Sequence, residues 1–330
     1  MKYIDMHCDT IPRLCLPSVE ERGETLRRNS GHLDLERMKQ GSAMAQCFAV
    51  YTNLKEQADP YAYAKKILTR FKKEIKENSG MISQALTAED ILKNDREGKM
   101  SALLTIEEGA VCQGSLERLR EFYEEGVRMM TLTWNYPNDL AWPNRINLQT
   151  GETEPETEHG LTETGFAFVE EMERLGMLID VSHLGDTGFW DIVKHTKQPF
   201  MASHSNARSE ASHVRNLTDD MIRVLAERGG VMGINFCGAF LSNSNRNAKG
   251  GGISRTADMV RHMKHIRQIG GIECIGLGSD FDGISGELEV DSPAALYKIA
   301  DEMSRQGFTG SEIDAVFYKN VLRVFTEILH

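Results

Sequence analysis

The sequence predicts a single α/β domain spanning residues 1–330, folded as a (β/α)8 TIM barrel with extra helices. Two observations carry this prediction. Short apolar runs alternate with longer amphipathic segments along all 330 residues, and eight of the runs have the length of strands. Five of these eight runs end in a carboxylate or an imidazole. Barrel enzymes carry their catalytic residues at such strand ends.

The expected strands are the apolar runs at residues 3–9, 42–51, 100–107, 127–134, 177–183, 199–204, 231–237 and 273–280. Most are followed by a helical pattern, so each pair is typical of a βα unit in a parallel sheet. Eight such units fit a closed barrel better than an open sheet.

The segments between the strands have the spacing of amphipathic helices, and several begin at Ser, Thr or Asp and end at Gly. The stretch "TDDMIRVLAERGGVMGINF" at residues 218–236 shows a cap, a helix, a glycine stop and a strand. Residues 54–100 hold two helical patterns, so we expect one of them to be an insertion. The segment at 309–328 is expected to form a terminal helix packed on the outside.

Residues 135–160 form the longest stretch without periodicity. Long irregular loops in compact domains are usually functional or disordered. This loop follows the fourth strand, so we expect it to lie over the catalytic mouth of the barrel.

The composition argues against several classes of partner. The net charge is -11 and no basic block occurs, which argues against binding to nucleic acid or to an anionic membrane surface. We see no signal peptide and no apolar run long enough to span a bilayer. The six cysteines form no CxxC pair and are expected to be buried free thiols, which favours a cytoplasmic location.

The polar residues at the strand ends are the strongest functional signal. They are His7, Asp9, Glu107, Glu108, His183, His204, Asp280 and Asp282. In a strand, residues two apart point to the same face, so His7 and Asp9 can both face the barrel mouth while Cys8 faces the helices. A single such residue is more often a hydrogen-bonded histidine or a helix cap. The coincidence across five strands is not explained that way, because burying several titratable groups together is costly without a cation. Histidine and carboxylate ligands suit zinc, and one carboxylate can bridge two ions.

At these residues the sequence resembles the renal (membrane) dipeptidase family, peptidase family M19, of the amidohydrolase superfamily. The resemblance runs through "DMHCDT", "EEGA", "LTLTWN", "LGMLIDVSHL", "SHSNAR", "RNLTDD", "GINF" and "IGLGSDFDG" in order. An HxD motif in the first strand, in place of the HxH of other amidohydrolases, marks this family.

The resemblance implies a role for each residue at the strand ends. His7 and Asp9 would bind one zinc ion, and His183 and His204 would bind a second. Glu108 would bridge the two ions, and Glu107 would point to the opposite face.

The resemblance also implies the groups that act on the substrate. Asp280 would take a proton from a hydroxide-forming water between the ions and pass it to the leaving amine. Arg215 would hold the substrate carboxylate, a task suited to a guanidinium group, although a surface position near a helix cap is the simpler alternative. Family members often carry a histidine where this chain has Trp134, so Trp134 and the neighbouring Asn135 are expected to contact the substrate instead.

We therefore expect a zinc-dependent dipeptidase that cleaves L,L and, as the resemblance suggests, L,D dipeptides. An amidohydrolase acting on N-acyl amino acids, cyclic amides or esters is the alternative, and a metal-binding protein without catalysis is a third. Family members are often homodimers, but the sequence carries no interface signal.

Overall fold

The computed structural model describes residues 1–147, 150–245 and 251–329. Its central feature is a closed parallel barrel in the order β2-β1-β12-β10-β9-β8-β5-β4, closed by the pairing of β2 with β4. The barrel strands are β1 (Tyr3–Asp5), β2 (Ala43–Tyr51), β4 (Met100–Glu107), β5 (Val127–Thr131), β8 (Leu178–Asp180), β9 (Met201–Ala202), β10 (Val231–Ile234) and β12 (Ile275–Leu277). Each lies within one of the expected runs or within one residue of it, so the predicted (β/α)8 fold is confirmed.

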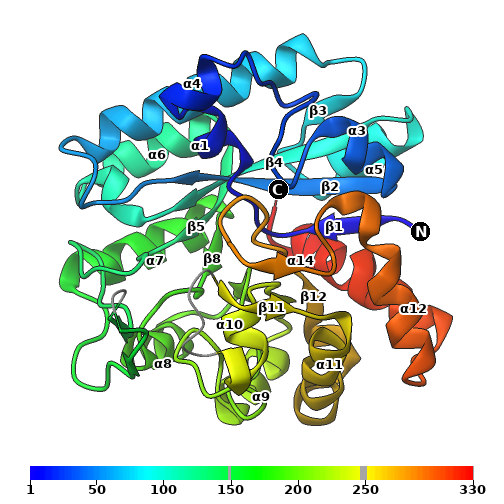
Figure 1. Cartoon of the computed structure of the whole chain (residues 1–330). Helices are drawn as coiled ribbons and strands as arrows, with labels where there is room; N and C mark the ends of the chain where they lie inside the picture. The colour runs from blue at the N-terminus through cyan, green and yellow to red at the C-terminus, as the bar shows by residue number, and fades with distance from the viewer. Residues whose placement is uncertain (148–149, 246–250, 330) are drawn as a thin grey trace.

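Helices surround these strands (Figure 1). They are α1 (Thr10–Leu14), α2 (Pro17–Glu20), α3 (Leu35–Gln40), α4 (Pro60–Glu77), α5 (Ala88–Arg96), α6 (Leu116–Glu124), α7 (Glu163–Leu175), α8 (Asp186–His195), α9 (Asp219–Glu227), α10 (Gly238–Leu241), α11 (Thr256–Gly270), α12 (Tyr297–Arg305), α13 (Gly310–Asp314) and α14 (Asn320–Ile328). The predicted boundaries of α9 are confirmed. Thr218 accepts a hydrogen bond from the Met221 amide at its start, and Gly229 takes a left-handed φ of 75° just after its end.

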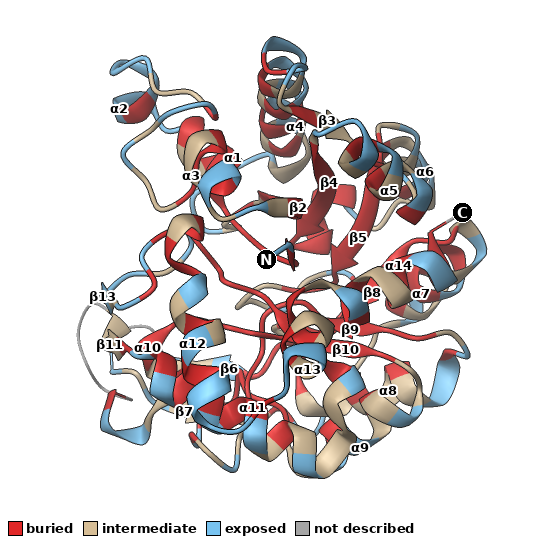
Figure 2. Cartoon of the chain, turned by 90° about the vertical axis from the view of Figure 1, so that its right-hand side faces the viewer, coloured by how far each residue is buried: buried red, intermediate tan, exposed pale blue. Residues whose placement is uncertain are grey.

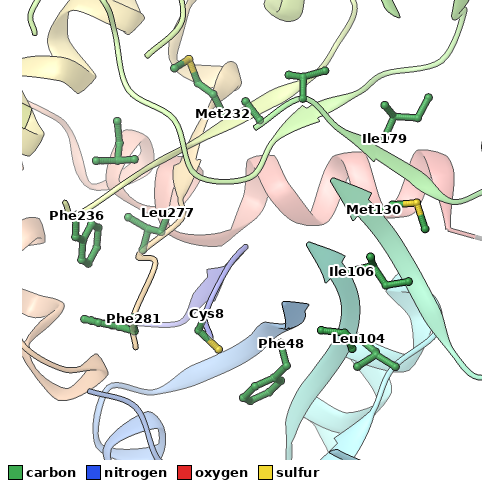
Figure 3. Close-up of a cluster of buried hydrophobic side chains, with 14 of the residues drawn as sticks. Cys8, Phe48, Leu104, Ile106, Met130, Ile179, Met232, Phe236, Leu277 and Phe281 are labelled. Atoms are coloured by element: carbon green, nitrogen blue, oxygen red, sulfur yellow. The ribbon is translucent and has the colours of Figure 1, made fainter. Parts of the chain in front are cut away.

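The alternation of side chains along β4 shows how the strands are packed. Ala102, Leu104 and Ile106 belong to the apolar layer between the strands and the helices, whereas Leu103 belongs to a second cluster. Figure 3 shows Leu104 and Ile106 in the first layer, together with Cys8 from the chain after β1. Cys8 therefore packs on the helical side, as predicted. Apart from the two end residues of β2, the barrel strands are buried, while the outer helices expose one face (Figure 2).

The terminal helix differs from the prediction. Val321, Val324 and Phe325 of α14 pack in the second cluster, with Ile4 of β1 and Leu103 of β4. This helix therefore packs against the other set of strand side chains rather than in the outer apolar layer. Its apolar face is long enough to cover those side chains, which would otherwise meet water.

The expected insertion lies between β2 and β4 and includes an unpredicted strand. β3 (Ile82–Gln84) lies between α4 and α5 and pairs with the first residues of β4, Met100–Ala102. β5 pairs with β4 only from Leu104 onward, so β3 occupies the part of β4 that β5 leaves open.

The loop after β5 contains a short antiparallel pair, β6 (Arg145–Ile146) and β7 (Thr153–Glu154), which its lack of periodicity did not predict. Residues 148–149 of this loop lie outside the described residues. A second short pair, β11 (Ile253–Ser254) and β13 (Glu287–Leu288), is parallel. All six cysteines are buried and unpaired, as predicted. Among the described residues, no helix combines the length and the apolar content that crossing a membrane requires.

Candidate metal centre

Three imidazoles converge on the carboxylate of Glu107, at the end of β4. His183 Nε2 lies 3.0 Å from Oε1, and His204 Nε2 lies 3.5 Å from the same oxygen. His7 Nε2 lies 3.4 Å from the other oxygen, Oε2. One carboxylate thus faces His7 with one oxygen and the pair of His183 and His204 with the other.

Two further carboxylates lie on the His7 side of this arrangement. Asp9 Oδ2 is 3.5 Å from His7 Nε2, and Asp280 Oδ1 is 4.0 Å from it. Gly283 makes this approach sterically feasible, because a Cβ at that position would collide with both carboxylates. The predicted residues His7, Asp9, His183, His204 and Asp280 are therefore brought together.

The backbone just beyond the strands turns sharply to place these side chains. His183 has φ of 68° and Asp280 has φ of 62°, both in the left-handed region. A residue other than glycine is held there at a cost of roughly 1–3 kcal/mol, and such positions cluster at functional sites. The Asp280 amide also donates a hydrogen bond to the His7 carbonyl at 3.2 Å, which joins the ends of β1 and β12.

Burial and mutual charge perturb the pKa values of the cluster. Burial raises the pKa of Asp280 to about 7 and that of Asp9 to about 6, with Glu107 adding to both. Burial also lowers the pKa of His183 to about 4 and the pKa of His204 well below its ordinary value. For His7, burial alone would lower the pKa, but Glu107 and Asp9 hold it well above its ordinary value.

The donor set fits bound metal ions. His7 Nε2 and Asp9 Oδ1 are buried and have no hydrogen-bond partner. His183 Nε2 and His204 Nε2 lie 3.0 Å apart, although burial keeps both rings neutral near pH 7. Two neutral nitrogens that face one another and a carboxylate oxygen are well placed to share a cation, and imidazole with carboxylate is a donor set that zinc accepts.

The expectation that Glu108 faces the histidines and that Glu107 faces away is wrong. Glu107 faces the histidines instead. Glu108 has φ of 94° and is turned out of the centre. Its Oε1 accepts a hydrogen bond from the Ala110 amide at 3.0 Å and another from the side chain of Asn138, and its Oε2 accepts one from the Trp134 amide at 3.0 Å.

The sequence held a signal for the correct choice. Residues Ala102, Leu104 and Ile106 are all apolar and pack toward the helices, so the alternate set that ends in Glu107 faces the other way.

Arg215 comes from the loop between β9 and α9 and is buried. Its Nη2 donates to the His204 carbonyl at 3.2 Å and its Nη1 to Ser205 Oγ at 3.5 Å. Its Nε is buried without a partner, and no carboxylate oxygen of the described chain lies within 4.0 Å of its guanidinium. The surface alternative for Arg215 is therefore wrong, because the side chain is buried.

Trp134 and Asn135 both line the central cavity, at the start of the loop after β5. Asn135 Oδ1 lies 2.9 Å from His183 Nδ1 and so orients that ring. The Trp134 ring packs edge-on against Tyr51 at 5.1 Å and against Tyr136 at 5.5 Å between ring centroids. Trp134 thus forms part of an aromatic wall of the cavity.

The cavity has a volume of about 420 Å³. Its walls are formed mainly by the loops after β1, β2, β5, β10 and β12. Among the candidate residues, those that line it are Asp9, Glu107, Trp134, Asn135, His183, Arg215 and Asp280. Asp282 lines it too, but its carboxylate accepts hydrogen bonds from Thr10 Oγ1 and the His32 amide, both at 2.6 Å, and so fastens the loop after β1.

Sequence reasoning missed the residues that support this centre. Asn235 Nδ2 donates to Asp280 Oδ2 at 2.8 Å. Asp5 and Asp180 are buried carboxylates that bind serines of neighbouring strands. A lone acid inside each of the apolar runs "YIDMH" and "LIDVSH" was the available signal, since a buried carboxylate needs partners.

The chain is similar to known proteins along its whole length. The model of the membrane dipeptidase family (peptidase family M19) matches residues 1–330. An uncharacterized protein from the pqqA 5′ region of Klebsiella pneumoniae is 33% identical over 271 residues, which are 82% of this chain and 97% of that protein. A metallo peptidase from Rhodobacter sphaeroides, liganded with a phosphinate mimic of the dipeptide L-Ala-D-Ala, matches with a TM-score of 0.88 and 24% identity over 99% of both chains. A dipeptidase described as an M19 metallo peptidase matches with a TM-score of 0.89 and 26% identity, over 100% of this chain and 99% of that chain.

Proposed function

The chain belongs to the membrane dipeptidase family, peptidase family M19, and is a metallo-dipeptidase; from this premise we propose that it cleaves dipeptides with two zinc ions. The proposed ligands are the nitrogen and oxygen donors of the centre: His7, Asp9, Glu107, His183 and His204. Glu107 would take the bridging position that the family resemblance implied for Glu108.

The arrangement around Glu107 carries this proposal. Its Oε2 faces His7, and its Oε1 faces both His183 and His204. A carboxylate whose two oxygens serve separate groups of nitrogen donors suits a bridge between two ions. The buried His7 Nε2, which has no hydrogen-bond partner, supports an ion on that side.

Asp280 is the proposed proton carrier. When bound, two zinc ions lower the pKa of a water molecule and polarise the peptide carbonyl. Asp280 Oδ2 is held by Asn235, which leaves Oδ1 toward the centre, 4.0 Å from His7 Nε2. This oxygen accepts the proton of the attacking water and returns it to the leaving amine. A pKa near the working pH suits both transfers.

Arg215 is the proposed binding group for the substrate's terminal carboxylate. It is buried at the cavity wall, and no carboxylate of the described chain pairs with it. A buried guanidinium without a counter-ion favours an anionic ligand, because burial of an unpaired charge is costly. A cavity of about 420 Å³ suits a dipeptide better than a longer peptide.

The stereochemical range is also part of the proposal. The Rhodobacter sphaeroides enzyme was crystallised with a mimic of an L,D dipeptide. We include L,D dipeptides among the substrates for that reason, beside L,L dipeptides.

A substrate panel with and without a chelator tests this proposal. Purified protein is assayed on L,L dipeptides, L,D dipeptides, a tripeptide, N-acyl amino acids, a cyclic amide and an ester, before and after metal removal and zinc readdition. We expect cleavage of dipeptides that is lost with the chelator and restored by zinc. Turnover of the N-acyl amino acids, cyclic amide or ester alone would favour the alternative amidohydrolase, for which the aromatic Trp134 in place of an imidazole is the supporting observation. Bound metal without turnover of any compound would indicate a metal-binding protein.

A further inference from the structure

Two buried carboxylates occupy equivalent places at the ends of β1 and β8. Asp5 accepts hydrogen bonds from the amide of Ser279 at 2.8 Å and from its hydroxyl at 2.6 Å. Asp180 accepts a bond from the amide of Ser203 at 2.8 Å and another from its hydroxyl. Each pair thus links two barrel strands that carry residues of the metal centre.

The two pairs differ in what the serine hydroxyl contacts next. Ser203 Oγ lies 2.7 Å from Nδ1 of the adjacent His204. The second contact of Ser279 Oγ as a donor is the His7 carbonyl at 3.3 Å, and no imidazole nitrogen among the described residues bonds to it. Asp180, Ser203 and His204 therefore form a series of hydrogen bonds that reaches an imidazole, and the pair of Asp5 and Ser279 has no such extension.

The direction of the hydrogen bonds in this series follows from the surroundings of Asp180. Its Oδ1 accepts from the amides of Ser182 and Ser203, and its Oδ2 lies 2.7 Å from Thr131 Oγ1 and within bonding distance of Ser203 Oγ. A carboxylate surrounded by donors acts as an acceptor at both oxygens. The single hydroxyl proton of Ser203 therefore points at Asp180 rather than at Ser182 Oγ, which lies farther away at 3.3 Å, so Ser203 Oγ accepts from His204 Nδ1.

We propose that Asp180 is a positioning residue that acts through Ser203 to keep His204 as the Nδ1–H tautomer, with the Nε2 lone pair facing the metal centre. A neutral imidazole carries one proton, so a proton on Nδ1 leaves Nε2 free. That atom lies 3.0 Å from His183 Nε2 and 3.5 Å from Glu107 Oε1. Carboxylates that set the tautomer of metal-binding histidines usually bind the ring directly, and here a hydroxyl lies between them.

Asp180→Asn tests the inference because it preserves the size of the side chain while it reverses the direction of the hydrogen bonds between residue 180, Ser203 and His204. The new amide nitrogen would take the place of Oδ2 and donate to Ser203 Oγ and Thr131 Oγ1, whose hydroxyls can rotate. Ser203 would then donate to His204 Nδ1 and move the ring proton to Nε2. We expect the ¹⁵N signals of His204 in the metal-free protein to change from the Nδ1–H to the Nε2–H pattern. We also expect the zinc affinity to fall by about 10–100-fold, as for other partners of metal-binding histidines.

Asp5→Asn is the matched control. It places the same change in the equivalent pair, where Ser279 can donate to the His7 carbonyl and no imidazole proton is involved. We expect this variant to keep the His204 signals and to lose less zinc affinity than Asp180→Asn, since Asp5 contacts the metal centre only through the amide of His7, at 3.5 Å. Ser203→Ala, which removes the acceptor of the Nδ1 proton, is the second test if Asp180→Asn does not fold, and it should give a mixture of both tautomers.

The outcomes separate this inference from the proposed function, on whose metal site it rests. An unaltered chain that binds no zinc would overturn the proposed site, while the ¹⁵N signals would still decide the tautomer. Zinc binding by the unaltered chain and equally by Asp180→Asn, with unchanged His204 signals, would overturn only the inference. Equal losses of affinity in Asp180→Asn and Asp5→Asn would also overturn it, because they would point to a general loosening of the barrel.

Discussion

His183 Nε2 and His204 Nε2 face each other at 3.0 Å, although the two residues follow different strands and are 21 positions apart in the chain. Burial holds the pKa of both rings below the ordinary value for histidine. Two neutral rings at this distance either share one hydrogen bond or bind a cation together, and Glu107 Oε1 beside them favours the cation.

Replacement of one ring should therefore remove one metal ion selectively. His183→Asn is expected to lower the zinc content from two ions to one per chain, because His7 and Asp9 remain on the other side of Glu107. Metal analysis after dialysis measures the change. Retention of both ions would show that the pair does not bind metal.

Glu107 and Glu108 should respond differently to the same substitution. Glu107→Gln is expected to lower the zinc content at both positions. Glu108→Gln should keep the zinc but destabilise the fold by about 1–3 kcal/mol, because an amide nitrogen would face the Trp134 amide or another donor. Metal analysis and denaturant unfolding of both variants check this, and a loss of zinc in Glu108→Gln alone would reverse the assignment.

Asp280→Asn should separate turnover from metal binding. Asparagine keeps the size of the side chain but does not accept a proton, so kcat should fall by about 10²–10⁴-fold. Zinc content should stay unchanged, since all five proposed ligands remain. Steady-state kinetics on zinc-loaded protein decide the matter, and an unchanged kcat would exclude Asp280 as the proton carrier.

Arg215→Met should act on substrate binding. Removal of a buried charge-assisted bond to the substrate carboxylate is expected to raise KM for a dipeptide by about 10–100-fold. The corresponding dipeptide amide lacks that carboxylate and serves as the control, so its KM should change much less. Equal effects on both substrates would place the role of Arg215 elsewhere, for example in support of His204 through its carbonyl.

His262 should make the fold sensitive to acid. It is buried on α11, where Nδ1 accepts from the Ala207 amide and Nε2 bonds to the Leu241 carbonyl. Burial lowers its pKa from 6.5 to about 4, so the unfolded chain takes up a proton first as the pH falls. The free energy of unfolding should therefore decrease as the pH falls from 6.5 to 4, by up to about 3 kcal/mol. Unfolding free energies between those pH values should depend less on pH in His262→Asn, and an identical slope would contradict the prediction.

Much of the fold could be predicted from the sequence, because the signals are local. The apolar run "MSALLTIE" and the capped segment at 218–227 are each specified by neighbouring residues, and the structure has a strand and a helix there. β3 was missed because three residues carry too little periodicity to be recognised, and its pairing with Met100–Ala102 depends on what β5 leaves open. The packing of α14 against the strands was missed for a related reason, since an amphipathic pattern does not say which apolar surface it covers.

The sequence by itself determined which strand ends carry imidazoles and carboxylates, because each strand and its last residues are adjacent in the chain. It also determined that His7 and Asp9 share a face, through the two-residue period of an extended chain. The alternation of β4 favoured Glu107 over Glu108 only weakly, because Leu103 is apolar as well, and the tertiary structure decided that Glu107 meets the histidines. The hydrogen bonds that join Asp180, Ser203 and His204 likewise depend on the pairing of β8 with β9. No local pattern in the sequence encodes the register of that pairing.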